Sequence, residues 1–555
     1  MDDTLHHKAL LLLLVSLAGC TAEPDFDLVL AGGDVLDGTG AAAVRADVGV
    51  RDGRIAEIGD LAERSAAERI DVSGHVVAPG FIDPHTHARG TIFEMPTADN
   101  FVRQGVTTLV EGNDGGSPLD LGRWYDSLTA AGGTGPNFAM FVGHGTIREE
   151  VLGEEDRAPS PDELERMRAL VEQGMHDGAL GLSTGLFYLP GSFATTEEVI
   201  ELARVAGRYG GIYISHMRNE GDGVFESIDE TIRIGREAGI PVQMTHHKIG
   251  AWRNFGRASE SVERIAAARA DGVDITFDQY PYTASSTGLS AIIPRWAQEG
   301  DRLEERLADP ATRRRVVADM IEWIEMRFAG DPSKIQLVSC RFQDTRADGG
   351  AAPTANGEPA SAGPAAAAGF PDDLAGVTLA EILAFRGVEA TETAVAELIL
   401  EIDGLGGCGA IFHAFDEGDV RTLLQAEHGM IGSDGSLVHY GRASPHPRGY
   451  GTFPRVLGHY ARDLGVIGLP EAVRRMTSAP ADRLGFADRG RIAPGHVADL
   501  TVFDPETVID RATFDDPHQY PVGIPHVFVG GVAVVRDGAV TGARPGVVLR
   551  GPGAR

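Results

Sequence analysis

The sequence predicts a mixed α/β protein, a (β/α)8 barrel of the TIM type with a small β-sandwich domain formed from both chain ends. Short apolar runs alternate with amphipathic helical stretches through the middle of the chain, which is typical of parallel βαβ units. Segments typical of short strands stand near both termini. The chain has 555 residues, which is enough for more than one domain.

The first segment, residues 1–19, is expected to be an export signal. Its apolar run, residues 9–17, has the length of a signal-peptide core and is too short to span a bilayer. The run ends in LAGC, which resembles the bacterial lipoprotein signal, where cleavage precedes a cysteine that is then acylated. We expect a lipid anchor on Cys20 in the bacterial cell envelope. An ordinary secretory signal, or a misassigned start on a cytosolic enzyme, is the alternative.

Residues 26–78 and 486–548 are predicted to form the small β-sandwich domain. Strand-like segments separated by Gly and Asp turns occur in DLVLAGGDVLDG and ADVGVRDGRIAEIG near the start, and in HVADLTVFDP and HVFVGGVAVVRDG near the end. Because these segments flank a long middle region, we expect the two ends of the chain to meet in one domain.

Residues 79–485 are predicted to form the barrel, because eight apolar runs that end in Gly or polar residues alternate there with helical patterns. A doubly wound sheet is the alternative, but we find no convincing Gly-rich phosphate loop for it. The eight runs are VVAPGFIDPHTH, GVTTLVEGN, NFAMFVGHG, GALGLSTG, GIYISHMR, VQMTHHK, DITFDQYPY and GMIGSDG.

An insertion is expected at about residues 284–375, between the last two runs. Residues 347–369 within it are Ala-, Gly- and Pro-rich, which is typical of a linker or loop tip. The adjacent helical pattern DRLEERLADPATRRRVVADMIEWIEMR predicts a lid.

Composition limits the partners. The chain has 49 Lys and Arg residues and 81 Asp and Glu residues, which gives a net charge of -32 at pH 7. Nucleic-acid binding is disfavoured, because so acidic a surface repels the phosphate backbone. Membrane contact is expected only through the N-terminal anchor, and we make no prediction of oligomeric state. The three cysteines have no metal-ligand spacing. If Cys20 is lipidated, only Cys340 and Cys408 are left to pair.

Imidazoles and a carboxylate follow the predicted strands, at the end of the barrel where catalysis takes place in this fold. Such ligands suit Zn²⁺ with an open coordination position. His246 and His247 point to opposite faces of a strand, so only one should bind, and we choose His246. The candidate residues are His85 and His87 after the first run, His216 after the fifth, His246 after the sixth and Asp434 after the eighth.

These motifs resemble a known family. GFIDPHTH together with GSDG is similar to the amidohydrolase superfamily. From about residue 26 to about residue 545, outside the low-complexity segment, the chain further resembles the N-acyl-D-amino-acid deacylase (D-aminoacylase) family. The motifs that carry this resemblance are GVTTLVEGNDGGSP, VGHGTIR, GALGLSTGLFYLPG, ISHMRNEGD, DQYPYTASST, PHPRGYGTFPRVLG and GRIAPGHVADLTVFDP.

The resemblance implies a metal centre and its ligands. Hydantoinase- and dihydroorotase-type amidohydrolases bridge two metals with a carboxylated lysine, but no lysine lies between residues 9 and 247 here. The deacylases instead use a cysteine in a GNCG-like pattern, and this sequence has Asp114 at that position. Glu111 is a competing ligand, and a purely structural turn at Asp114 is the remaining alternative.

By resemblance, Asp114, His216 and His246 form the tighter metal site, and His85 and His87 the weaker one, for one or two Zn²⁺ ions. Asp434 is then the general base. His144 is expected to support the site without binding metal. Cations and hydroxyls expected to bind the substrate are Lys248, Arg448, Tyr188, Tyr280 and Tyr282, with core packing as the alternative for each tyrosine.

The expected function is zinc-dependent hydrolysis of the amide bond of N-acyl-D-amino acids, a small-molecule substrate. The preference for the D enantiomer is implied by the resemblance alone. A dipeptidase, or another amidohydrolase acting on peptidoglycan-type fragments, is the first alternative. A non-catalytic, surface-anchored binding protein is the second; the histidines argue against it, and the aspartate at position 114 argues mildly for it.

Overall fold

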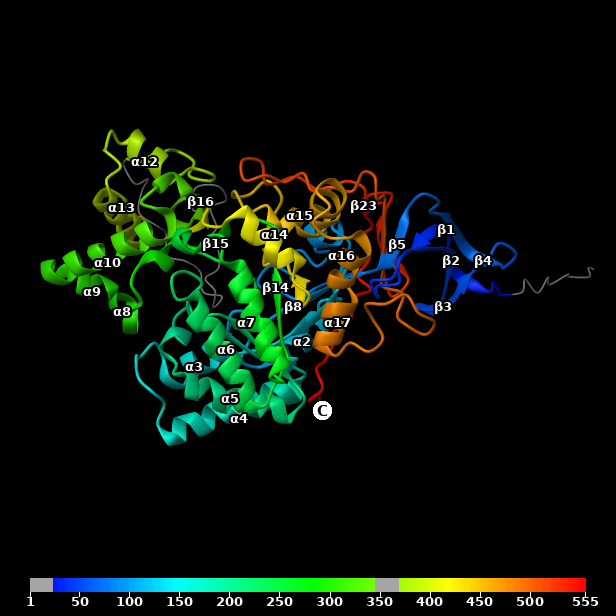
Figure 1. Ribbon diagram of the computed structural model, residues 1–555, viewed down its shortest axis with the longest axis horizontal. Coiled ribbons are helices and arrows are strands. Elements are labelled where there is room, and N and C mark those ends of the chain that lie inside the picture. The colour runs from blue at the N-terminus through cyan, green and yellow to red at the C-terminus, as the bar shows by residue number, and fades with distance from the viewer. Residues whose placement is uncertain (1–22, 345–368) are drawn as a thin grey trace, which may run out of the picture.

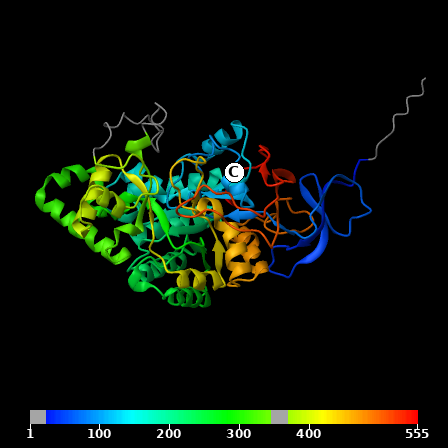
Figure 2. The ribbon, with the colours of Figure 1, turned by 90° about the horizontal axis from the view of Figure 1, so that it is seen from above.

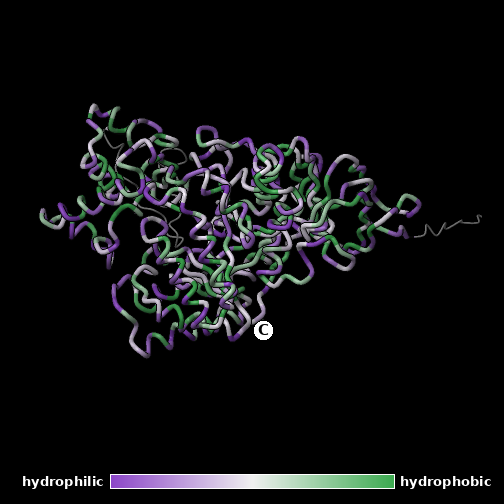
Figure 3. Tube along the Cα trace, viewed as in Figure 1, coloured by the Kyte–Doolittle hydropathy of each residue, from purple (hydrophilic) through white to green (hydrophobic). Residues whose placement is uncertain are grey.

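Parallel strands and their connecting helices occupy the centre of the molecule, and the two other groups of elements lie at its opposite ends (Figures 1 and 2). The computed structural model describes residues 23–344 and 369–555. At one end lies a β domain that contains the first strands of the chain, and at the other lies the segment inserted between β14 and β18. Hydrophobic segments are concentrated where the central strands and helices meet (Figure 3).

The central strands pair in parallel and in chain order. One sheet has the order β6-β8-β9, a second has the order β10-β11-β12-β13-β14-β18, and β7 pairs with β19. Nearly every position of these strands is buried, as expected for strands covered on both faces. The bounds are β6 Phe81–Asp83, β7 Thr86–His87, β8 Val106–Glu111, β9 Asn137–Met140, β10 Val142–Gly143, β11 Gly181–Gly185, β12 Ile212–His216, β13 Val242–Met244, β14 Ile275–Gln279, β18 Gly429–Ile431 and β19 Gly435–Ser436.

Helices between the strands pack on the outside of the sheets; α5 contacts β11 and β12, and α6 contacts β13. Local sequence sets their ends: Ser160 caps α4 in a capping box with Glu163. The helices are α1 Asp99–Val102, α2 Leu121–Ala130, α3 His144–Leu152, α4 Pro161–Asp177, α5 Thr196–Arg208, α6 Val224–Ala238, α7 Ala258–Ala270, α14 Glu417–Gln425, α15 Arg448–Arg455, α16 Leu469–Met476 and α17 Ser478–Leu484.

Both ends of the described chain contribute to one nine-stranded sheet. In it, β20 pairs antiparallel with β5, which places Leu500 opposite Pro79. Leu30, Val48 and Val502 belong to the apolar core of this sheet. Its strands are β1 Phe26–Val35, β2 Val44–Arg51, β3 Arg54–Gly59, β4 Ala66–Asp71, β5 Val76–Pro79, β20 Leu500–Phe503, β21 His526–Val529, β22 Val532–Arg536 and β23 Ala539–Val540.

The segment between β14 and β18 folds around its own apolar core, which runs from Leu289 to Ala414 and so beyond the expected 284–375. A three-stranded antiparallel sheet, β15-β17-β16, supports it. Of the low-complexity residues 347–369, all but Gly369 lie outside the described residues. The elements are β15 Ser285–Gly288, α8 Arg295–Gln298, α9 Leu303–Ala308, α10 Pro310–Phe328, β16 Ile335–Cys340, α11 Arg341–Asp344, α12 Leu379–Phe385, α13 Glu392–Gly404 and β17 Cys408–Phe412.

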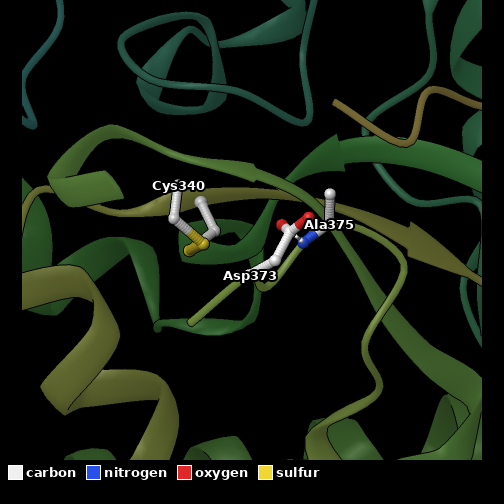
Figure 4. The surroundings of a disulfide bond; sticks show 4 residues. Cys340, Asp373 and Ala375 are labelled. Carbon is white, nitrogen blue, oxygen red and sulfur yellow. Dashed lines mark hydrogen bonds between the residues drawn. A yellow bond between two sulfur atoms is a disulfide. The ribbon is translucent and has the colours of Figure 1, made fainter. Parts of the chain in front are cut away.

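A disulfide joins Cys340 and Cys408, the facing ends of β16 and β17. Figure 4 shows this bond beside the turn in which the Ala375 amide donates to the Asp373 carboxylate at 2.9 Å. Across residues 23–344 and 369–555, no helix has the length and apolarity needed to cross a membrane. The expected signal, residues 1–19, and Cys20 lie outside the described residues.

Candidate metal centre

A cavity of about 440 Å³ opens at the carboxyl ends of the central strands. Its walls include His87 at the end of β7, Asp114 after β8, His216 at the end of β12, His246 after β13 and Asp434 after β18. Because the strands are parallel and in chain order, residues more than 300 positions apart in the sequence meet at one edge.

Two groups of potential ligand atoms form in this cavity. Donor atoms of His85, His87, Asp114 and Asp434 all lie within 4.8 Å of one another, and so do donor atoms of Asp114, His216 and His246. The carboxylate of Asp114 belongs to both groups. Its Oδ1 lies 3.6 Å from His216 Nδ1 and 3.4 Å from His246 Nε2, and its Oδ2 lies 3.4 Å from His87 Nε2.

Several of these converging atoms are buried without a hydrogen-bond partner: His85 Nε2, Asp114 Oδ1 and His216 Nδ1. Leaving such atoms unpaired is unfavourable, by about 1–3 kcal/mol for each group. A divalent cation between them would satisfy all three, and imidazole with carboxylate is a donor set that suits zinc. The residues present therefore fit the metal that the sequence motifs imply.

The backbone at the centre is held in an unusual conformation. Asp114, His246 and Asp434 all have left-handed backbones, with φ of 54°, 37° and 51°. Such positions cost of order 1–3 kcal/mol and are found preferentially at functional sites. Asp278 stabilises one of them, because its Oδ1 accepts the His246 amide at 2.8 Å.

Comparison with known proteins places these observations in a family. The model of the Amidohydrolase family matches residues 68–304 and 359–535. The chain is 40% identical over 546 residues to the D-aminoacylase of Alcaligenes xylosoxydans xylosoxydans, covering 94% of this chain and 97% of the relative. This chain belongs to the N-acyl-D-amino-acid deacylase family. The N-acyl-D-glutamate deacylase of the same organism is 36% identical over 545 residues, covering 94% and 96%.

Solved structures of the family share the fold of this chain. A crystal structure of D-aminoacylase matches with a TM-score of 0.77 at 38% identity, covering 95% of this chain and 100% of that one. The N-acyl-D-glutamate deacylase of Bordetella bronchiseptica, solved with zinc and a phosphonate inhibitor, matches with a TM-score of 0.76 at 35% identity, covering 95% and 99%.

Asp114 stands where the deacylase motif has cysteine, and the structure separates it from its competitor Glu111. Glu111 accepts a hydrogen bond from the Thr86 hydroxyl at 2.7 Å and another from the Ala88 amide. It belongs to neither group of potential ligands, whereas Asp114 belongs to both. Glu111 thus holds the segment that carries His85 and His87.

Asp434 is fixed on both sides. Its Oδ1 lies 3.0 Å from His87 Nε2, and its Oδ2 accepts from Arg448 Nη1 at 2.6 Å. Burial by itself raises the pKa of Asp434, but the charges of Arg448 and of nearby imidazoles outweigh burial and lower this pKa overall. The carboxylate is therefore ionised, as a proton acceptor must be.

Lys248, a predicted substrate cation, lines the cavity but is paired within the protein. Its Nζ donates to Glu220 Oε1 at 2.8 Å and lies 2.6 Å from His246 Nδ1. Burial raises the pKa of Glu220, but Lys248 and the two histidines His216 and His246 lower it well below its usual range. Glu220 was not predicted from the sequence. It lies four residues after His216 in ISHMRNEGD, and this position close to the end of a strand could have indicated a carboxylate partner for Lys248.

The three predicted tyrosines are placed differently. Tyr188 lines the cavity, and its ring centroid lies 4.6 Å from that of His216. Tyr280 is buried, with Arg448 4.7 Å from its ring centroid and a hydroxyl without a partner. Tyr282 does not line the cavity, because its hydroxyl faces Asp510 at 3.5 Å.

Two further histidines lie outside the two ligand groups. His247 Nε2 lies 2.5 Å from the hydroxyl of Ser261, so the structure places His246 in the cavity and its neighbour away from it. His144 Nε2 lies 2.9 Å from Glu198 Oε1 in the interior.

The inserted segment supplies cavity residues that the sequence analysis did not name. Arg327 and Trp323 reach the cavity from α10, and Val338 and Phe412 reach it from β16 and β17. The helical pattern of α10 predicted a lid, but it did not show which side chains face the barrel. Arg89, from the segment after His87, also lines the cavity.

Proposed function

We propose that this protein hydrolyses the amide bond of N-acyl-D-amino acids and releases a carboxylate and a free D-amino acid, with one or two zinc ions bound. One observation carries the proposal: unpaired imidazole and carboxylate atoms converge beside Asp434 in a single cavity. Full-length similarity to a D-aminoacylase supports it. The residues that would hold the metal are Asp114, His216 and His246, together with His85 and His87.

When bound, zinc polarises the amide carbonyl and lowers the pKa of a coordinated water. The chain itself supplies the proton transfer. Asp434 accepts a proton from the attacking water and then donates it to the departing amine, as a general base that becomes a general acid. Its hydrogen bond with Arg448 and its contact with His87 keep one oxygen oriented toward the centre.

The substrate carboxylate lies one carbon from the amide nitrogen, so groups beside the centre must bind it. Arg448 can do so with the part of its guanidinium that faces the cavity, and Lys248 adds positive charge next to His246. Tyr188 supplies a hydroxyl on the same cavity surface. Tyr280 buttresses Arg448 by stacking beneath it.

The strand pairings support a closed (β/α)8 barrel. Within the sheets β6-β8-β9 and β10-β11-β12-β13-β14-β18 the strands follow chain order, and the pairing of β19 with β7 joins the segment after β18 to the segment after β6. We further propose that the nine-stranded sheet of the terminal strands folds over on itself as a β-sandwich, because β1 pairs with three strands, β2, β4 and β5.

The decisive experiment is hydrolysis of paired D and L N-acetyl amino acids by the purified protein, with zinc removed and then restored. We expect release of the D amino acid only, loss of activity on chelation and recovery with zinc. Hydrolysis of the L member, or turnover that survives chelation, would contradict the proposal.

We also propose that the protein is exported and lipid-anchored through Cys20. The LAGC sequence after an apolar run supports this, and so does a disulfide, because disulfides persist in oxidising compartments. The Cys20→Ala variant should move from the membrane fraction to the soluble fraction on cell lysis. Equal partitioning of the variant and the wild type would contradict the anchor.

A further inference from the structure

The cations of the cavity differ in how they are paired. Lys248 donates to Glu220 at 2.8 Å, Arg448 donates to Asp434 at 2.6 Å, and Arg89 donates to the Gly116 carbonyl at 2.5 Å. In the part of the chain that the structure describes, the Arg327 guanidinium has neither a hydrogen bond nor an ion pair, and its Nε is buried without a partner. The exposed fraction of Arg327 is only 7%.

Burying a charge that has no hydrogen-bonded partner is unfavourable, so a guanidinium placed in this way in a cavity wall calls for an explanation. The Glu220 carboxylate acts on Arg327 electrostatically but accepts no hydrogen bond from it. An arginine keeps its proton at neutral pH and therefore stays cationic there. Its Cζ lies over the ring of Trp323, 5.1 Å from the ring centroid. The tryptophan compensates for part of the lost hydration, but the N–H donors remain available to a ligand.

The helix that carries Arg327 is fixed against the barrel. The indole of Trp252, in the loop after β13, donates to the Glu325 carbonyl of α10 at 2.9 Å. In the same loop, a Cβ on residue 250 would come within 2.7 Å of Arg327 Nη2, so Gly250 leaves the space that the guanidinium uses. Arg327 is thus held in place and does not sample solvent freely.

Resting on the proposed function, we infer that Arg327 is a specificity-determining residue that binds a second carboxylate of the substrate. Arg448 and Lys248, which lie beside the reacting amide, bind the first carboxylate, the one on the α-carbon. Arg327 belongs to the wall contributed by the inserted segment, and the other residues of this segment that line the cavity, such as Val338 and Phe412, carry no charge. A guanidinium binds a carboxylate through two parallel hydrogen bonds, which uncharged isosteres do not reproduce. The substrates are therefore N-acyl-D-amino acids with an additional acidic group, in the side chain or in the acyl chain.

The test uses two pairs of substrates matched in size but not in charge. N-acetyl-D-glutamate and N-acetyl-D-glutamine differ in the side chain, and N-succinyl-D-leucine and N-succinamoyl-D-leucine differ in the acyl chain. The zinc-loaded wild type, Arg327→Met, Arg327→Lys and Arg315→Met are compared. Arg315 is the matched control, since it lies on the same helix, packs 4.1 Å from the ring centroid of Trp296 and is exposed.

We expect the wild type to prefer the acidic member of one of the two pairs. The pair for which it shows this preference identifies whether the second carboxylate lies in the side chain or in the acyl chain. Arg327→Met should lose roughly 30-fold or more in kcat/KM for that acidic substrate, mainly through KM. It should stay within about 3-fold for the neutral partner, as expected when one truncation removes one binding interaction. Arg327→Lys should recover part of the loss, and Arg315→Met should behave as wild type.

The thermal midpoint without substrate gives an independent readout. Because Arg327 has no hydrogen bond or ion pair within the described residues, Arg327→Met should unfold at about the same temperature as the wild type or higher, whereas loss of a structural ion pair would lower it. An unchanged ratio of acidic to neutral turnover in Arg327→Met, or equal loss for both substrates, would overturn the inference. Failure of the wild type to hydrolyse any of the four substrates would instead refute the proposed function and, with it, the inference.

Discussion

The two walls of the cavity differ in how their charged side chains are paired. On the wall formed by the central strands, Lys248 and Arg448 each contact a carboxylate, and the unpaired atoms are lone pairs that converge on one point. On the wall formed by the inserted segment, apolar side chains and small hydroxyl side chains surround one guanidinium that has no hydrogen bond or ion pair among the described residues. The strand wall therefore carries the proposed metal ligands and the proposed base, whereas the inserted segment carries the guanidinium proposed to bind a second carboxylate.

The largest expected effect is on the strand wall. Asp434→Asn should lower kcat by about 10²–10⁴-fold, because the amide cannot accept the proton of the attacking water. Zinc content, measured by elemental analysis, should stay near that of the wild type, since the histidines and Asp114 remain. Retained turnover in this variant would show that another group acts as the base.

The second-largest effect is expected at Asp114, because this residue of the strand wall belongs to both groups of potential metal ligands. Asp114→Ala should lose zinc and activity together, while Asp114→Cys, which restores the residue of the deacylase motif, should keep zinc because thiolate is a good zinc ligand. Zinc titration followed by activity measurement checks both. If Asp114→Ala bound zinc as tightly as the wild type, Asp114 would be only a turn residue.

The pairing of charges predicts opposite stability effects on the two walls. Glu220→Gln leaves Lys248 buried beside His246 without its carboxylate, so unfolding should become easier by about 3 kcal/mol. Arg327→Met should not destabilise the protein, because it breaks no hydrogen bond or ion pair among the described residues. Thermal unfolding of the metal-free variants measures the difference. Equal thermal midpoints for Glu220→Gln and the wild type would remove the distinction between the walls.

The smallest effect on turnover is expected from the disulfide. Replacing Cys340 and Cys408 by serine releases a link between residues 68 positions apart and should destabilise the inserted segment by about 2 kcal/mol. Turnover of neutral substrates should change by less than about 3-fold, because no group of the strand wall moves. Hydrogen exchange localised to β16 and β17 would register the loosening. A large fall in kcat would mean that the insertion also shapes the catalytic wall.

Much of the centre could be predicted from the sequence. Strand periodicity predicted that only one of His246 and His247 would face the cavity, and the choice of His246 agrees with the structure. The structure places His246 and His247 after the end of β13, so the turn that follows this strand, and not strand alternation, separates the two rings. The choice between Asp114 and Glu111 stayed open, because both lie near the end of β8. The structure distinguishes them, since Glu111 is engaged by Thr86 and Ala88.

The partners of the substrate cations could not be predicted in the same way. Lys248 and Arg448 were expected to be available to a ligand, yet each is already bonded to a carboxylate. Tyr282 shares the DQYPYTASST motif with Tyr280, but the chain turns between them and its hydroxyl faces Asp510, more than 200 residues away in sequence. Such pairings depend on which segments meet in space, and no local pattern reports this.

By itself, the sequence determined the alternation of strands and helices, the ligand types at the strand ends and the family. Each depends on local spacing or on residue identity, both of which can be read along the chain. Only the tertiary structure decided how the inserted segment forms one side of the cavity, which cations are hydrogen-bonded to carboxylates, and that Arg327 has no hydrogen bond or ion pair among the described residues. Those properties follow from the packing of distant elements, because the energy of a buried charge is set by its neighbours in space and not by its neighbours in sequence.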